Sequence, residues 1–360
     1  MITEDSIRQR FKQGEQFNFA ACRLPFSDTI YFFYSDRPCK LTRLQYQADS
    51  RTDFIFSPYA AGNQAYHMQA SLMYKNDAPI YGWDAKLMPV EKPLFTTNNF
   101  EADENFYKRY VSDIITDIEQ EDTDKVVAAR ALRRALPDSF SHSNFFFQLL
   151  QQYPHAMVYY VNHAEWGCWC GATPEMLLTA TENKLQTMSL AGTMPAHSKE
   201  AWGEKELQEQ AMVTDFIEQI FEKYQLTIQI NQTSELVSGK IKHLCTKLES
   251  KTDEEWLTQK FHKLLADLNP TPAVCGIPQF NASVFIGKHE KLERRFYSGF
   301  LGISAPKHIQ LYVNLRCMEI GLQDALLYAG AGITAYSSPT KEWQETINKL
   351  MVLGSIINDV

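Results

Sequence analysis

Long apolar runs are missing from this chain of 360 residues. Its longest apolar stretches, residues 144–150 and 156–161, are far shorter than the roughly 18 residues that a membrane-spanning helix needs. The N-terminus also lacks a basic start followed by an apolar segment. We therefore expect no secretory signal peptide and no membrane partner.

An excess of basic residues is missing as well. The chain has 35 Lys and Arg against 43 Asp and Glu, and its formal net charge is -8. Binding to nucleic acid needs a basic surface, so we expect no nucleic-acid partner. An anionic substrate would need cations placed locally at its site, because the net charge does not attract it.

The cysteines lack the even number and regular spacing of a disulfide framework. There are seven of them, scattered along the chain, which favours reduced thiols and a cytoplasmic location. Cys168 and Cys170 are too close together for a usual zinc knuckle, and no matching Cys/His pair lies nearby in the sequence. We interpret them as core residues rather than metal ligands.

What is present is the composition of a folded protein, with 44% hydrophobic and 12% aromatic residues. The length suits two domains or one large one. Alternating or aromatic-rich segments predict strands over residues 29–34, 53–57, 125–128, 156–160, 166–171, 175–180, 184–190, 308–317 and 325–329. Helical spacing of apolar residues predicts helices over 101–120, 202–223, 256–268 and 341–357.

The order of these elements indicates the fold class. We expect the chain to become helical or irregular from Arg130 onward, and a turn at Gly321 to join strands 308–317 and 325–329. Strands and helices alternate without a regular βαβ repeat. The sequence therefore predicts an α+β fold with a large, mostly antiparallel sheet.

Two pairs of glutamates have helical spacing. Glu206 and Glu209 lie three residues apart in one predicted helix, and Glu342 and Glu345 do so in another. Residues at this spacing share a helix face. If the two pairs meet, their repulsion calls for a divalent cation with oxygen ligands. The alternative is that both pairs form ordinary solvated faces.

Other candidate residues also have two interpretations. Gly330 follows a predicted strand, where its backbone could approach an anion or simply form a tight turn. Arg316 could hold a carboxylate through two hydrogen bonds or form a structural ion pair. Lys125 and Glu175 could be a base and an acid, or surface residues.

Nine segments together carry a resemblance. They read KVVAAR at 125–130, GATPEMLL at 171–178, LAGT at 190–193, KELQE at 205–209, LNPTPAVCGIP at 268–278, RRFYSGFLG at 294–302, LRC at 315–317, YAGAGI at 328–333 and EWQET at 342–346. In this order they resemble the chorismate-utilising enzymes, the family that holds isochorismate synthase, salicylate synthase, anthranilate synthase and aminodeoxychorismate synthase.

The resemblance implies one chorismate-binding domain over residues 1–360. Residues 105–357 form its recognisable catalytic portion, and residues 1–100 form a divergent N-terminal part of the sheet. The family's fold has a large, mostly antiparallel sheet with flanking helices.

The resemblance also indicates a branch of the family. Members that use water have a lysine at the position of Lys125, whereas anthranilate synthases that use ammonia have glutamine there. Aminodeoxychorismate synthase has a lysine where this chain has Ala191. The chain is most similar to isochorismate synthase, an isomerase. One departure is Asn269, where members of this branch commonly have histidine, and we assign no role to that position.

The resemblance implies a role for each candidate residue. Lys125 is the base that activates water for attack at C2 of chorismate, and Glu175 is the acid that protonates the departing C4 hydroxyl. Glu209 and Glu345 are direct ligands of Mg²⁺, and Glu206 and Glu342 support it through water. The substrate contacts implied are Gly192, Thr193, Tyr297, Arg316, Gly330 and Lys349.

The chemistry requires particular states of the acid and the base. Lys125 acts as a base only when uncharged, and Glu175 acts as an acid only when a dry pocket keeps it protonated. Because water is the nucleophile, we expect a monomer with no glutamine amidotransferase subunit. Two alternatives stay open, a salicylate synthase that also eliminates pyruvate and a non-catalytic chorismate-binding protein. The product could serve menaquinone or siderophore biosynthesis.

Overall fold

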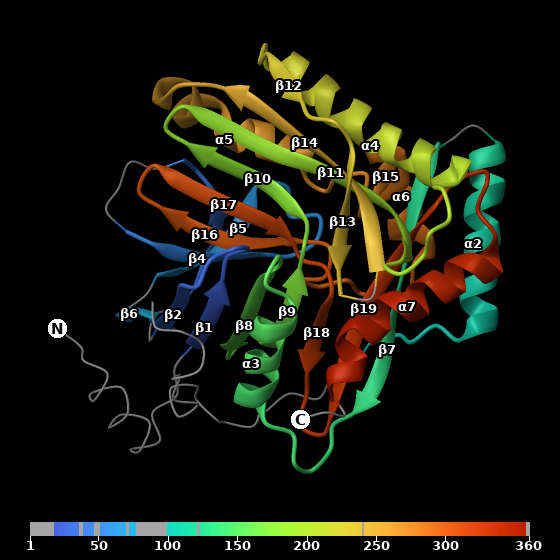
Figure 1. Cartoon of the computed structure of the whole chain (residues 1–360), viewed down its shortest axis with the longest axis horizontal. Coiled ribbons are helices and arrows are strands. Elements are labelled where there is room, and N and C mark those ends of the chain that lie inside the picture. Colours follow the sequence, from blue (N-terminus) through green and yellow to red (C-terminus); the bar gives the residue numbers. More distant parts are fainter. Residues whose placement is uncertain are drawn as a thin grey trace.

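The computed structural model describes residues 18–35, 39–46, 51–69, 72–76, 99–120, 123–239 and 241–357. The strands in these residues form two antiparallel sheets (Figure 1). The first sheet has the order β15 (Gly276–Ile277), β7 (Lys125–Ala135), β19 (Asp324–Ile333), β18 (Cys317–Ile320), β9 (Gly167–Thr173), β8 (Met157–His163), β1 (Asn18–Arg23), β2 (Ile30–Ser35) and β6 (Leu72–Asn76).

The second sheet has the order β12 (Ile228–Ile230), β14 (Ile241–Lys251), β11 (Lys184–Pro195), β10 (Met176–Thr181), β17 (His308–Val313), β16 (Phe300–Ala305), β4 (Asp53–Ser57), β5 (Gln64–Gln69) and β3 (Leu41–Arg43). A further strand, β13 (Ser234–Ser238), also pairs with β14. The α+β class and the large antiparallel sheet core predicted from the sequence are confirmed, with the core divided between two sheets.

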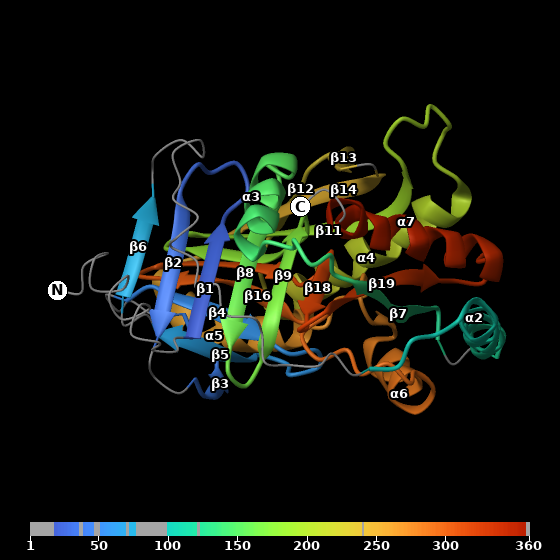
Figure 2. The same cartoon turned by 90° about the horizontal axis from the view of Figure 1, so that it is seen from below.

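Helices pack on the outer faces of both sheets, and Figure 2 shows α3 (His142–Gln152) and α7 (Pro339–Ile357) beside the first one. These two helices pack on the first sheet, and α4 (Glu204–Lys223) and α5 (Glu254–Leu268) pack on the second. α2 (Glu104–Glu119) and α6 (Gln279–His289) close one end against β7. The fold therefore has four layers, with helices outside and two sheets inside.

The layer between the sheets is aromatic. Phe56 of β4 stacks on Phe296 with ring centroids 4.1 Å apart, and Trp169 of β9 makes a T-shaped contact with the same Phe296 ring. Contacts of this kind add stabilisation beyond the burial of apolar area. This cluster joins the two sheets into one core.

Helix starts follow from local capping. The carboxylate of Asp103 accepts a hydrogen bond from the backbone N–H of Phe106 at 2.7 Å at the start of α2. Asp253 does the same for Trp256 in α5. Such caps satisfy backbone donors that have no partner within the helix.

Two predictions about the strands are wrong. β7 continues past Arg130 to Ala135, because this whole segment pairs with β19. Residues 308–317 do not form one strand, because β17 ends at Val313 in the second sheet and β18 begins at Cys317 in the first. The strand is interrupted at Asn314, and β17 does not pair with β19. Both strands are buried, and their apolar pattern runs on without marking the break.

The chain passes between the two sheets at two neighbouring places. Pro174 and Glu175 connect β9 of the first sheet to β10 of the second, and residues 314–316 connect β17 of the second to β18 of the first. The two connections are neighbours, because the N–H of Val313, the last residue of β17, donates to Glu175 O at 2.9 Å. Glu175 and Arg316 therefore meet where the sheets exchange strands.

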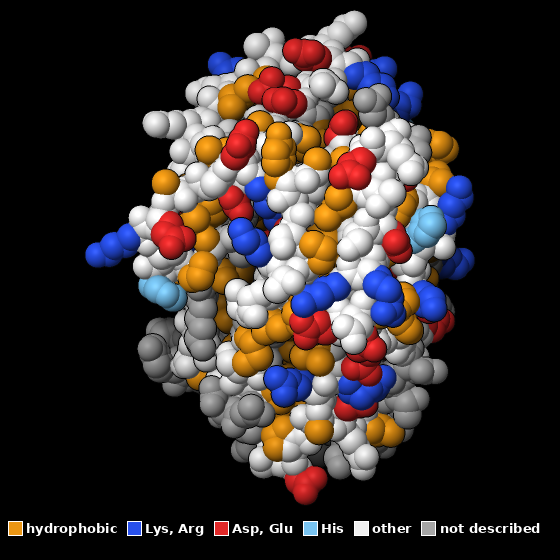
Figure 3. Space-filling model, turned by 90° about the vertical axis from the view of Figure 1, so that its right-hand side faces the viewer, with side chains coloured by type: hydrophobic (Ala, Val, Ile, Leu, Met, Phe, Trp, Pro, Cys, Tyr) orange, Lys and Arg blue, Asp and Glu red, His pale blue; other side chains and the backbone are white. Residues whose placement is uncertain are grey.

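All seven cysteines are free and buried, in agreement with the prediction of core thiols. Among the described residues, no helix is long and apolar enough to cross a membrane. On the face that Figure 3 shows, acidic, basic and hydrophobic side chains are interspersed.

Candidate active site

Lys125 begins β7 and is fully buried. Its Nζ lies 3.0 Å from Glu209 Oε1 of α4. No acceptor in the described part of the chain lies in hydrogen-bonding geometry around Nζ. Because its side chain is fully buried, Lys125 is not a surface residue. A buried amine needs a specific partner, and Glu209 is that partner.

Glu175 is also buried, with 3% of its surface exposed. Burial raises the pKa of its carboxyl to about 8, although Lys125, Arg316 and Lys349 act to lower it. At neutral pH the protonated form therefore predominates. A carboxylic acid in this state can donate a proton.

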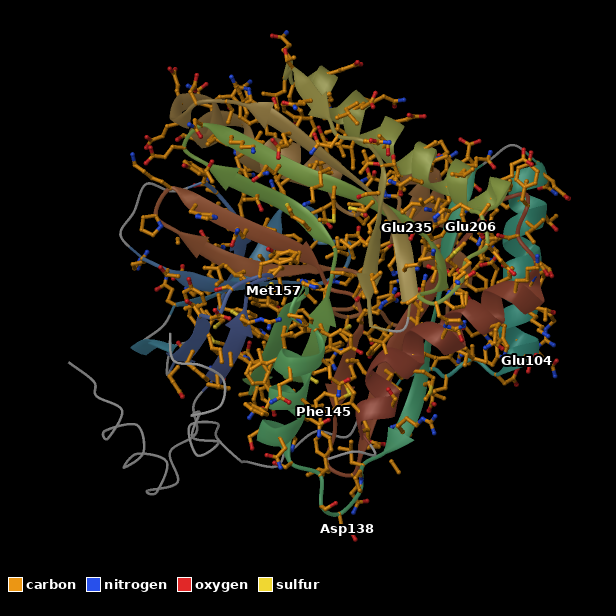
Figure 4. The ribbon with its side chains drawn as sticks, in the orientation of Figure 1. Glu104, Asp138, Phe145, Met157, Glu206 and Glu235 are labelled. Carbon is orange, nitrogen blue, oxygen red and sulfur yellow. The ribbon has the colours of Figure 1, made fainter. Side chains whose placement is uncertain are left out.

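The two glutamate pairs come together at the N-terminal ends of α4 and α7. Lys205 Nζ lies 3.0 Å from Glu342 Oε1 and 3.7 Å from Glu345 Oε2. Glu206 lies on the same end of α4, as Figure 4 shows, with its Cβ close to Gly192. The solvated-face interpretation is wrong for Glu209 and Glu342, which are buried.

The carboxylates of α7 differ in protonation. Burial and the nearby Glu345 raise the pKa of Glu342 to about 7. Burial acts in the same direction on Glu345, but Lys349 and Lys205 outweigh it and lower the pKa of Glu345 to about 2. Lys349 Nζ is 2.7 Å from Glu345 Oε1.

Arg130 fixes the part of α7 that carries these carboxylates. Its Nε donates to Thr346 Oγ1 at 2.7 Å, and its guanidinium lies 3.7 Å from the centroid of the Trp343 ring. Cation–π contact and a buried charge-assisted hydrogen bond are both stronger than their exposed equivalents. Because Arg130 lies on β7, the same strand positions Lys125 and α7.

A small cavity of about 40 Å³ lies among these groups. Its lining includes Glu175, Gly192, Thr193, Glu209, Tyr297, Arg316, Gly330 and Lys349 from the sequence prediction, together with His243, Gly332 and several apolar residues. The structure thus gathers the predicted acid, one predicted metal ligand and all six predicted substrate contacts around one space.

Glycine is required at Gly332, opposite Val127 in the β7–β19 pair. A Cβ there would lie 2.1 Å from Glu209 Oε1 and 2.9 Å from Lys125 Cε. Such distances are sterically forbidden without movement of the ion pair. Gly332 therefore provides the space in which Lys125 and Glu209 meet.

Arg316 is not inside a strand, as the sequence pattern suggested, but in the connection between β17 and β18 with φ of 48°. It is buried, and its Nη2 lies 3.1 Å from His243 Nε2. Its Nε has no hydrogen-bond partner within the described residues. A buried, unpaired guanidinium N–H is suited to bind an anion.

His243 is a residue that the sequence analysis missed. Its Nδ1 lies 2.7 Å from Gly192 O and its Nε2 faces Arg316, so Nδ1 carries the proton and Nε2 accepts. Burial and Arg316 lower the pKa of His243 to about 3, which keeps the ring neutral. A single histidine in a strand carries no pattern that would have singled it out.

The remaining predicted contacts line the same space. Lys349 Nζ donates to Gly330 O at 2.8 Å, and Thr193 Oγ1 is 3.3 Å from His243 Nδ1. Tyr297 is buried, and burial raises the pKa of its hydroxyl to about 12. By contrast, Asn269 lies outside this lining and donates to Gly62 O at 2.7 Å.

The donor set fits a hard cation in its chemistry. Glu342 and Glu345 already share one cationic group, the ammonium of Lys205. Carboxylate oxygens are the ligands that Mg²⁺ prefers, and Mg²⁺ keeps several waters of its own. Within the residues that the structure describes, no three acidic, histidine or cysteine side chains are arranged around a common metal position.

Comparison with known proteins decides the family. The sequence profile described as "Chorismate binding enzyme" matches residues 59–358. The chain belongs to this family. The match begins upstream of the segments from residue 125 onward that carry the resemblance.

The relatives of this chain include several isochorismate synthases. The vibriobactin-specific isochorismate synthase of Vibrio cholerae is 29% identical over 331 residues, which cover 87% of this chain and 82% of that protein. Isochorismate synthase EntC of Escherichia coli is 26% identical over 245 residues, 65% of this chain and 62% of EntC. The crystal structure of the 2,3-dihydroxybenzoate-specific isochorismate synthase DhbC from Bacillus anthracis has 20% identity and a TM-score of 0.77, covering 98% and 99% of the two chains. This likeness supports the fold.

Proposed function

We propose that this protein is an isochorismate synthase that converts chorismate into isochorismate with Mg²⁺ as its cofactor. The observation that carries the proposal is Glu175, a buried carboxyl with a pKa raised to about 8 in a cavity lined by cationic groups. Glu175 can donate a proton to an anionic substrate in the cavity that it shares with Arg316 and Lys349. The names of the relatives support the same activity.

The reaction adds water at ring C2 and expels the C4 hydroxyl as water, with a shift of the ring double bonds. Glu175 donates the proton that hydroxide needs to depart, because hydroxide itself is a poor leaving group. Lys125 takes the proton from the attacking water. One water is added and one is lost, with one proton taken up and one released, so the conversion is an isomerisation.

The base role places a condition on Lys125. A lysine accepts a proton only when it is uncharged, and in this structure Lys125 Nζ is paired with Glu209 Oε1 at 3.0 Å. Lys125 must therefore be released from Glu209 in the catalytic complex before it can accept a proton. The ligand role proposed for Glu209 is consistent with this release, since the carboxylate would then have another partner.

The substrate is a dianion, and the cations of the cavity suit it. Arg316, with its unpaired Nε, would hold the enolpyruvyl carboxylate together with Tyr297 and the backbone at Gly330. Gly192, Thr193 and Lys349 would line the ring.

Glu209 and Glu345 would hold Mg²⁺ directly, and Glu206 and Glu342 would support it through water. When bound, Mg²⁺ would neutralise the ring carboxylate among these acidic residues.

The test is incubation with chorismate and Mg²⁺, followed by separation of isochorismate, salicylate and pyruvate. We expect isochorismate, at most traces of salicylate, and no turnover in excess chelator until Mg²⁺ is restored. Mass spectrometry should show no covalent adduct, because Ala191 offers no amine to the ring. Stoichiometric pyruvate would identify a salicylate synthase, and binding without turnover would identify a non-catalytic protein.

A further inference from the structure

Lys205 holds a central position among the carboxylates. Its Nζ lies 3.0 and 3.1 Å from the two oxygens of Glu342 and 3.7 Å from Glu345 Oε2. The negative charge of Glu209 also acts on it. Only 15% of the Lys205 side chain is exposed. One ammonium group thus neutralises several of the carboxylates that we assign to the metal.

The place of Lys205 in its helix is unfavourable on local grounds. It is in the first turn of α4, which begins at Glu204. The N-terminal end of a helix has a partial positive charge and disfavours a lysine there. The carboxylates of α7 offset this cost, so the position of Lys205 depends on tertiary contacts that a bound metal would change.

An open space lies beside the ion pairs. A cavity of about 440 Å³ is lined by Lys205 itself, Gly203, Glu206, Glu342, Glu345 and Asn348, among others. A lysine has four rotatable bonds in its stem. The side chain therefore has room to leave Glu342 and Glu345 without any movement of the backbone of α4.

We propose that Lys205 is an internal counter-cation that stabilises the metal-free site and that a divalent cation displaces when it binds. The inference rests on the proposed metal site and adds a determinant of its affinity. An ammonium and a metal ion cannot both occupy the point between Glu342 and Glu345. Each therefore weakens the binding of the other. The residue lowers the affinity for metal while it keeps the empty site folded.

The experiment uses the full chain and Mn²⁺ as the probe, because free Mn²⁺ is measured directly by electron paramagnetic resonance. Lys205→Met should bind Mn²⁺ at least about fivefold more tightly than the unchanged protein, since a competing ion pair has been removed. Lys260→Met is the matched control. It removes the same charge from exposed Lys260 in α5, away from the carboxylates of α4 and α7, and should change the affinity less than about twofold.

Thermal unfolding gives a second readout that needs no turnover. Without metal, Lys205→Met should unfold at a lower temperature than the unchanged protein, and saturating Mn²⁺ should stabilise the variant more. If Lys205→Met is poorly folded, Lys205→Gln takes its place in both measurements. Unchanged or weaker Mn²⁺ binding in the folded variant would overturn the inference while leaving the metal site intact.

The proposed metal site is tested separately in the unchanged protein. Glu345→Gln should weaken Mn²⁺ binding by more than about tenfold, because a direct carboxylate ligand is lost. If the unchanged protein binds no Mn²⁺, or if Glu345→Gln binds it normally, then the metal site is wrong and the inference about Lys205 fails with it.

Discussion

Two carboxyl groups in this site are held in opposite states by their surroundings. Burial dominates at Glu175 and raises its pKa to about 8, whereas Lys349 and Lys205 lower the pKa of Glu345 to about 2. The first group is suited to give a proton and the second to bind a cation. Residues of the same type thus acquire different chemistry through their neighbours.

A prediction about pH follows at the same scale. Glu175 must be protonated to act as an acid, so kcat should fall as the pH rises through about 8. Glu175→Gln should lose at least about a hundredfold in kcat and should no longer show this fall. Lys125→Ala should lose a similar factor, but its residual activity should still fall above pH 8.

The measurement is kcat in both directions against pH, with the fold checked by circular dichroism. Both variants should lose the forward and reverse reactions equally, since the same two groups act in each. If Lys125→Ala retained more than about a tenth of kcat, the base would be another group.

At the scale of elements, the β7–β19 pair organises the site. β7 supplies Lys125 and, through Arg130, holds α7, while β19 supplies Gly330 and Gly332. Gly332 leaves the space in which α4 brings Glu209 to Lys125. Gly330 instead faces the hydroxyl of Tyr297. The relative positions of Lys125, Glu209 and the carboxylates of α7 therefore depend on two strands and two helices together.

Gly332→Ala tests this arrangement. The added Cβ would collide with the carboxylate of Glu209 and the stem of Lys125, so we expect a loss of at least about tenfold in kcat/KM. Gly287→Ala is the matched control, because a Cβ at this exposed position in α6 meets no atom within 4 Å. It should leave kcat/KM unchanged and stabilise the helix by up to about 1 kcal/mol.

Steady-state kinetics and thermal unfolding of the two variants separate the effects. Normal kinetics of Gly332→Ala would show that the ion pair between Lys125 and Glu209 does not need the space that this glycine provides.

At the scale of the whole molecule, the site lies where the chain crosses between the two sheets. Glu175 and Arg316 come from the two crossings, β7 and β19 supply one wall, and α4 and α7 bring the carboxylates. All of these elements belong to one chain. The roles proposed for these residues therefore require no residue from a second subunit.

We therefore predict that the protein is a monomer in solution. Water is the proposed nucleophile, so no amidotransferase subunit is needed to deliver ammonia. We expect light scattering after size-exclusion chromatography to give one species near the chain mass of 41.4 kDa. A mass of twice this value at micromolar concentration would contradict the prediction.

The sequence by itself determined the family, the class of fold and the residues to examine. Nine short segments in order were enough, because the position of each residue within its segment singles out Lys125, Glu175 and the four glutamates. Helical spacing also correctly placed both members of each glutamate pair on one helix.

Only the tertiary structure decided what these residues contact. Whether Glu175 is protonated depends on burial between two chain crossings, and the break at Asn314 is invisible in a continuous apolar pattern. Lys205 was part of a recognised segment but had no assigned role, because its partners lie on α7, far along the chain. His243 had no pattern at all. Contacts between distant segments set charge states and free space, and periodicity within one segment carries no information about either.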